Sequence, residues 1–123
     1  MSVRKKLIIT NNPMVYEACA MKNEVVFEQG MDFMDVLLHV RNRIHAGGRL
    51  LTHPLSGSIK PFETPYKTVL MEMEGGGTDM DSLSIIEKSI ETAKKLHKPA
   101  MELTDAVKKD FQLIDFDLVM SAK

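Results

Sequence analysis

Residues 7–13 have the sequence Leu-Ile-Ile-Thr-Asn-Asn-Pro, and this stretch decides the fold. A short apolar run that ends at Asn and Pro is typical of a buried strand followed directly by a helix. Asn12 suits the N-cap of that helix, because its side chain can accept a backbone N–H, and Pro13 suits the first helical position, which needs no N–H donor. The stretch therefore predicts a strand over 7–10 and a helix over 13–21.

The next segments continue this alternation of strand and helix. Residues 24–28 are β-branched and aromatic and predict a second strand. A helix is expected to follow and to end before Gly47, because apolar side chains recur at helical spacing at Phe33, Leu37, Val40 and Ile44. Residues 49–52 predict a third strand. This βαβαβ order predicts an α/β fold with a three-layer, Rossmann-like core, a parallel sheet and helices on both faces.

The C-terminal half adds a fourth strand and two helices. No helix separates residues 67–73 from the third strand, so we expect an antiparallel strand at an edge of the sheet. Thr78 or Asp79 caps a helix that runs to about Lys98. A last helix begins after Thr104, with an apolar repeat at Val107, Phe111, Ile114 and Leu118. A single domain over residues 1–123 is predicted.

Composition excludes several classes of protein. The chain has 123 residues, a net charge of −1 and one cysteine, so neither a disulfide framework nor a general attraction to nucleic acid is expected. Its apolar runs are too short for a signal peptide or a membrane span. These features predict a cytoplasmic protein that binds neither nucleic acid nor membrane.

The segment 53–66 is the strongest candidate for a functional loop. It contains three prolines and has neither helical nor strand periodicity. If the strand order is 2-1-3, this loop and residues 10–13 both leave the carboxyl edge of the sheet, where ligands of open α/β sheets bind. Polar groups there could hold an anion, and His53 and Glu63 could move a proton. The predicted ligand-binding residues are Asn11, Asn12, Thr52, His53, Ser56, Gly57, Ser58, Lys60, Glu63 and Tyr66.

Two alternatives to a ligand site stay open for these residues. Asn, Ser and Gly also satisfy the backbone of tight turns, with no ligand involved. Ser56 and His53 are only three residues apart and do not form a recognised nucleophile–base pair. No glycine-rich phosphate motif and no metal-ligand spacing occurs, so no cofactor and no metal is expected, and whether the protein is an enzyme stays undecided.

Several stretches resemble one known family. Residues 50–61 have the sequence Leu-Leu-Thr-His-Pro-Leu-Ser-Gly-Ser-Ile-Lys-Pro, and residues 63–67 continue Glu-Thr-Pro-Tyr-Lys. Together with residues 7–13 and 110–115, these stretches closely resemble the GrdX family. The resemblance implies a small cytoplasmic protein encoded with glycine reductase, or with the related sarcosine, betaine or proline reductase systems of amino-acid-fermenting anaerobes. It implies no catalytic residues.

Two functions remain in competition at this point. The first is an accessory or assembly protein that docks on glycine reductase components through Thr52–Tyr66, with Phe62 and Tyr66 as anchors and Lys60 or Lys67 for orientation. The second is a small-molecule-binding protein or enzyme that takes an anionic metabolite at the carboxyl edge. A homodimer is a further expectation, because an edge strand at 67–73 could pair with a second copy.

Overall fold

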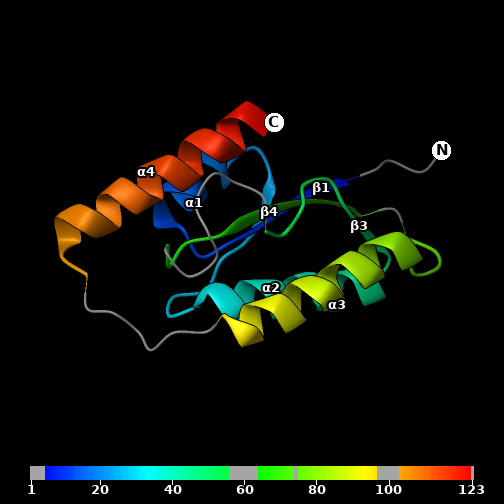
Figure 1. Ribbon diagram of the computed structural model, residues 1–123. Coiled ribbons are helices and arrows are strands. Elements are labelled where there is room, and N and C mark those ends of the chain that lie inside the picture. Colours follow the sequence, from blue (N-terminus) through cyan, green and yellow to red (C-terminus); the bar gives the residue numbers. More distant parts are fainter. Residues whose placement is uncertain (1–4, 56–63, 74, 97–102, 123) are drawn as a thin grey trace.

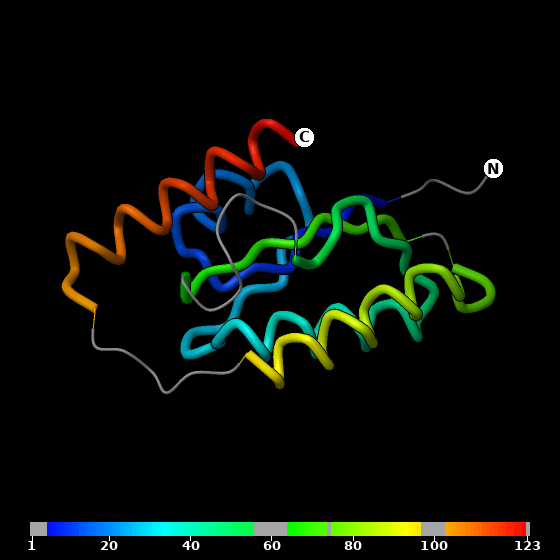
Figure 2. The backbone as a smooth tube through the Cα atoms, in the orientation of Figure 1, coloured from blue at the N-terminus to red at the C-terminus, as the bar shows by residue number. Residues whose placement is uncertain are grey.

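The described residues form four helices around a four-stranded sheet (Figures 1 and 2). The computed structural model describes residues 5–55, 64–73, 75–96 and 103–122. The elements occur in the predicted order, with shorter bounds for most strands. They are β1 (Lys5–Thr10), α1 (Pro13–Cys19), β2 (Glu24–Val26), α2 (Phe33–His45), β3 (Gly48–Leu50), β4 (Thr68–Met73), α3 (Met80–Lys95) and α4 (Asp105–Ala122).

The helix starts confirm the capping signals in the sequence. The Asn12 side chain accepts the backbone N–H of Met14 at 3.0 Å, and Pro13 is the first residue of α1. Asp79, and not Thr78, caps α3. Thr104 Oγ1 accepts the N–H of Val107 at 3.2 Å at the start of α4. Each cap satisfies an N–H group that the helix itself leaves without a partner.

The strand order differs from the prediction. The sheet has the order β2-β1-β4-β3, and β1 pairs with β2 in parallel. The fourth strand is antiparallel, as predicted, but it lies between β1 and β3 and not at an edge. The predicted contact between the first and third strands is therefore wrong, and the continuous parallel βαβαβ sheet is interrupted. The edge-strand argument for a homodimer is also removed, because β4 has a neighbour on each side.

The burial of β4 explains why it takes the inner position. Residues Thr68–Met71 are all buried, and β4 pairs with β1 over six residues, from Lys5 opposite Met73 to Thr10 opposite Thr68. A strand buried on both faces needs both of its backbone edges paired. β3 is only three residues long and half-buried beyond Gly48, so it suits the outer position.

Helices cover both faces of the sheet. On one face, α2 and α3 pack with Leu7, Ile9, Val69 and Met71 in the larger core (Figure 1). On the other face, Val15 and Cys19 of α1 and Val119 of α4 pack with Ile8 and Leu70. The strands alternate between these two cores, as a pleated strand requires. In the described part of the chain, no helix is long and apolar enough to cross a membrane.

The apolar repeat of α4 is not the face that packs on the sheet. The helix buries Asp115 and Val119, with Phe116 and Met120 partly buried beside them. Val107 and Ile114 are each 39% exposed and Leu118 is 43% exposed. The final helix therefore places a carboxylate toward the sheet and leaves an apolar stripe toward solvent.

Candidate functional site

The end of β1 meets the start of β4 on the face that α4 covers. Antiparallel pairing places Thr10 directly opposite Thr68, and their hydroxyl oxygens lie 2.7 Å apart. Residues directly opposite each other in such a pair have side chains on the same face. Asn11 and Asn12 follow Thr10, and the backbone N–H of Asn12 donates to Thr10 Oγ1.

A hydrogen-bond network joins this point to Asp115 of α4. Thr68 Oγ1 donates to Asp115 Oδ2 at 2.6 Å, and Asn12 Nδ2 donates to the same oxygen at 3.0 Å. Since Thr68 has one hydroxyl proton, its oxygen accepts the proton of Thr10, whose own oxygen accepts the Asn12 N–H at 2.9 Å. The donors therefore run in one direction, from the backbone of Asn12 through both threonines to the carboxylate.

Asn11 has a different structural role. Its Oδ1 accepts the backbone N–H of Lys67 at 2.8 Å, and its Nδ2 donates to the carbonyl of Pro65 at 2.8 Å. The side chain thus extends the pairing of β1 and β4 by fixing the backbone just before β4. These bonds use the amide groups that the sequence suggested for an anion.

A pocket of about 180 Å³ lies between α4 and the sheet beside this network. An apolar cavity of roughly 150 Å³ can hold a benzene-sized molecule, so the pocket has room for a small metabolite. Its polar wall includes Lys67, Thr68 and Asp115, and the full lining comprises Thr52, Lys67, Thr68, Leu70, Asp115, Leu118, Val119 and Ala122. The polar residues meet at one end, because Thr68 bonds directly to Asp115.

The electrostatics of the pocket are set by Lys67 and Asp115. Both residues are 8% exposed. Burial lowers the pKa of Lys67 below its ordinary value of 10.5, because a buried ammonium loses its hydration, and the charge of Asp115 opposes this by favouring the protonated lysine. A cation and an anion therefore share one small space.

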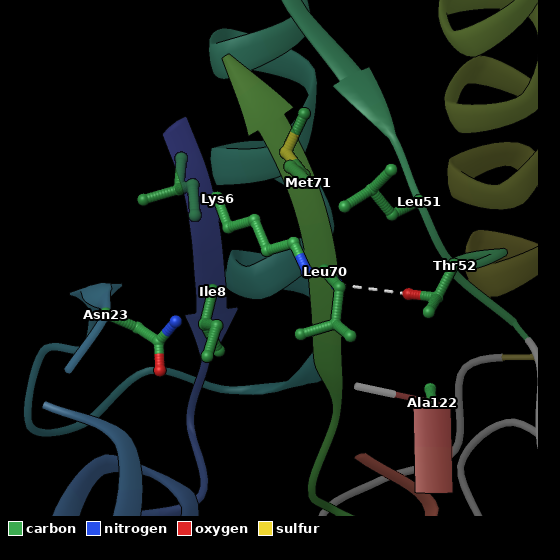
Figure 3. A pocket seen from close by; sticks show the side chains of 9 residues that line it. Lys6, Ile8, Asn23, Leu51, Thr52, Leu70, Met71 and Ala122 are labelled. Atoms are coloured by element: carbon green, nitrogen blue, oxygen red, sulfur yellow. Dashed lines mark hydrogen bonds between the residues drawn. The ribbon is translucent and has the colours of Figure 1, made fainter. Parts of the chain in front are cut away.

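A smaller cavity of about 60 Å³ adjoins this pocket (Figure 3). The two share Thr52, Leu70 and Ala122. Thr52 Oγ1 accepts the backbone N–H of Leu70 at 3.0 Å, the bond drawn in Figure 3, and so fixes the chain after β3 against β4. Roughly 30 Å³ of liquid belongs to each water molecule, so this space suits water better than a metabolite.

The predicted site residues fall into three groups. Asn11 and Asn12 are buried and bonded within the protein, and Thr52 lines the pocket. His53 is exposed, with Nδ1 accepting the Leu55 N–H at 3.1 Å, and the Tyr66 hydroxyl accepts a hydrogen bond from Gln112 Nε2 at 2.8 Å. The remaining predicted residues lie outside the described residues; they are Ser56, Gly57, Ser58, Lys60 and Glu63.

Sequence reasoning missed three residues that define the pocket. Thr68 and Asp115 were not considered for a site, and Lys67 was considered only for orienting a partner. A lone acid on a helix is ordinarily part of a solvated face, and the burial of Asp115 depends on which face of α4 meets the sheet. Within the ranges described, no group of three or more His, Cys, Asp or Glu side chains is placed to hold a metal ion.

Comparison with known proteins gives one match. Residues 7–122 match a family model described as GrdX, GrdX-like protein, which covers every element described above except the first two residues of β1. No curated protein and no solved structure matches the chain.

Proposed function

The chain belongs to the GrdX-like family, and on this basis we propose that it is an accessory or assembly protein of a glycine-reductase-type amino-acid reductase system. The observation that carries the proposal is the extent of the match, which includes both cores and the pocket. The family suggests association with glycine reductase systems. The partner is then a protein component of such a system.

The α4 stripe gives this partner a surface to bind. We define the α4 stripe as Val107, Ile114 and Leu118, which are exposed along one side of the helix. Exposed apolar patches of this kind are typical of protein–protein interfaces. Both described ends of the predicted docking segment reach α4: Tyr66 bonds to Gln112 on the packed side of the helix, and Thr52 lines the same pocket as Leu118 of the stripe.

Capture by purified reductase components tests the accessory role. The double variant Val107→Ser/Ile114→Ser removes two apolar side chains from the stripe without touching the pocket lining. Burying an aliphatic side chain contributes about 1.5–3 kcal/mol, so we expect binding to weaken by at least about tenfold for the pair. The matched control is Met21→Ser/Met80→Ser, which changes two exposed apolar residues elsewhere.

Each outcome of this experiment has a distinct meaning. Binding by the wild type and the control, with loss in the stripe variant, supports both the role and the surface. Equal binding by all three proteins rejects the α4 stripe as the binding surface but is compatible with the accessory role. No binding of any component by the wild type rejects the accessory role.

A second candidate function, binding of a small anionic molecule, is favoured by the pocket beside α4. The buried Lys67 lies in its wall and would supply the positive charge. This location differs from the edge predicted from sequence, where Asn11 and Asn12 are bonded internally. Thermal unfolding with acetate or propionate tests it: we expect a higher Tm for the wild type and no shift for Lys67→Met.

A further inference from the structure

The pocket beside α4 combines opposite charges at one end with an apolar wall, and we propose that it binds a small zwitterionic amino acid. Lys67 pairs with the ligand carboxylate, Asp115 accepts from the ligand ammonium, and a short aliphatic side chain lies along the remaining wall. This inference rests on the second candidate function and names the ligand class. It does not require docking by the α4 stripe, although Leu118 belongs to both the stripe and the pocket wall.

The unused hydrogen-bonding capacity of Asp115 supports an ammonium group. Both hydrogen bonds that this carboxylate accepts go to Oδ2, from Thr68 and from Asn12. Among the residues described by the structure, none donates to Oδ1. An ionised carboxylate has about four acceptor positions, and no buried side-chain oxygen of the described residues lacks a partner, so Oδ1 is accessible from the pocket. A ligand N–H group would donate to this accessible oxygen, with charge assistance.

The position of Lys67 supports a carboxylate in the same ligand. Its ammonium carries the positive charge in the pocket wall and lies close enough to Asp115 for the two charges to interact. A ligand with only a negative charge would be repelled by Asp115, and one with only a positive charge would be repelled by Lys67. A zwitterion gives each buried charge a further partner of opposite sign, and buried charges are tolerated when they are paired.

Size and wall composition restrict the rest of the ligand. Alanine has as many heavy atoms as benzene, and the pocket volume of about 180 Å³ exceeds the roughly 150 Å³ that accommodates benzene. Beyond the charged end, the wall is formed by aliphatic side chains of β4 and α4, namely Leu70, Leu118, Val119 and Ala122. A short aliphatic side chain fits this wall, whereas a second charged group would lose its hydration there.

Four small probes, carrying all, part or none of the alanine molecule's charge, separate the possibilities. L-Alanine carries both charges, propionate lacks the ammonium, ethylamine lacks the carboxylate, and propionamide carries no charge. Binding to the full chain at pH 7 is measured by thermal unfolding and by titration calorimetry. We expect alanine to bind at least about tenfold more tightly than each of the others, and to raise Tm by several degrees at 100 times its Kd.

The failures of the two proposals are distinguishable with the wild type alone. Propionate binding as tightly as alanine overturns the zwitterion inference but leaves a site for anions. If ethylamine binds more tightly than alanine and propionate, both the anion site and the zwitterion inference are overturned. The absence of binding by every probe also overturns both.

Variants then test the assigned partners. Asp115→Asn removes the charge but keeps an acceptor, so alanine is expected to lose its advantage over propionate. Lys67→Met is expected to abolish binding of both alanine and propionate. The control Lys94→Met removes an exposed lysine from α3 and is expected to leave all four affinities unchanged. If alanine keeps its full advantage in folded Asp115→Asn, the role given to that carboxylate is wrong.

Discussion

The replacement Thr68→Val breaks the hydrogen-bond network at its centre. Valine has nearly the same shape as threonine but has no hydroxyl group, so the backbone of β4 keeps its place. Two bonds are lost, the donation to Asp115 Oδ2 at 2.6 Å and the contact with Thr10 Oγ1 at 2.7 Å. Asn12 then becomes the single remaining donor to the carboxylate within the described part of the chain.

The structure gives the size of the effect. A hydrogen bond to a charged group contributes about 1.5–3 kcal/mol, and one between neutral groups contributes about 1 kcal/mol. Thr68 is 6% exposed, so water cannot readily replace these bonds. The free energy of unfolding should therefore fall by about 3 kcal/mol, which corresponds to a decrease in Tm of about 12 °C for a domain of this length.

Urea unfolding and thermal unfolding, both followed by circular dichroism, measure this change. The matched control is Thr92→Val on the exposed side of α3, which should stay within about 0.5 kcal/mol of the wild type. In the Thr68→Val background, Thr10→Val should cost clearly less than in the wild type, because its partner is already gone. A loss of less than about 1 kcal/mol for Thr68→Val, or strict additivity with Thr10→Val, would refute the network.

Three further predictions concern other parts of the fold. Asn11→Ala removes the 2.8 Å hydrogen bond from the Lys67 N–H and should lower the free energy of unfolding, measured in urea, by about 2 kcal/mol. The control Asn42→Ala changes an exposed residue and should leave this free energy nearly unchanged; equal losses for the two variants would contradict the structural role given to Asn11. Burial lowers the pKa of Lys67, so the unfolded chain binds more protons just below pH 10.5 and the free energy of unfolding rises with pH there; Lys67→Met should reduce this rise, and an unchanged pH slope would argue against the lowered pKa. Gly48→Ala would place Cβ 2.8 Å from a backbone oxygen of α2 and should cost about 1–3 kcal/mol, whereas Gly77→Ala meets no atom within 4 Å; equal Tm values for the two variants would contradict this.

The helices and strands could be predicted because their signals are local. The apolar run before Asn12 and Pro13, and the caps at Asp79 and Thr104, act through residues that are neighbours in the sequence. The order of the elements and the antiparallel direction of β4 were predicted correctly for the same reason. Three of the predicted site residues lie at or beside the pocket. Thr52 lies in its wall, and Asn11 and Asn12 form hydrogen bonds with Lys67 and Asp115 at its polar end.

Strand order and the packed face of α4 depended on contacts between distant residues. β4 lies beside β1 because burial of Thr68–Met71 requires pairing along both backbone edges, and no local pattern distinguishes an inner strand from an edge strand of the same composition. Similarly, α4 buries Asp115 although its apolar repeat runs along another side, because Thr68 and Asn12 supply donors for that carboxylate. The sequence by itself determined which segments are helices and strands. The tertiary structure alone decided where Lys67 and Asp115 meet, because their interaction joins residues far apart in the chain, at the point where α4 packs beside the start of β4.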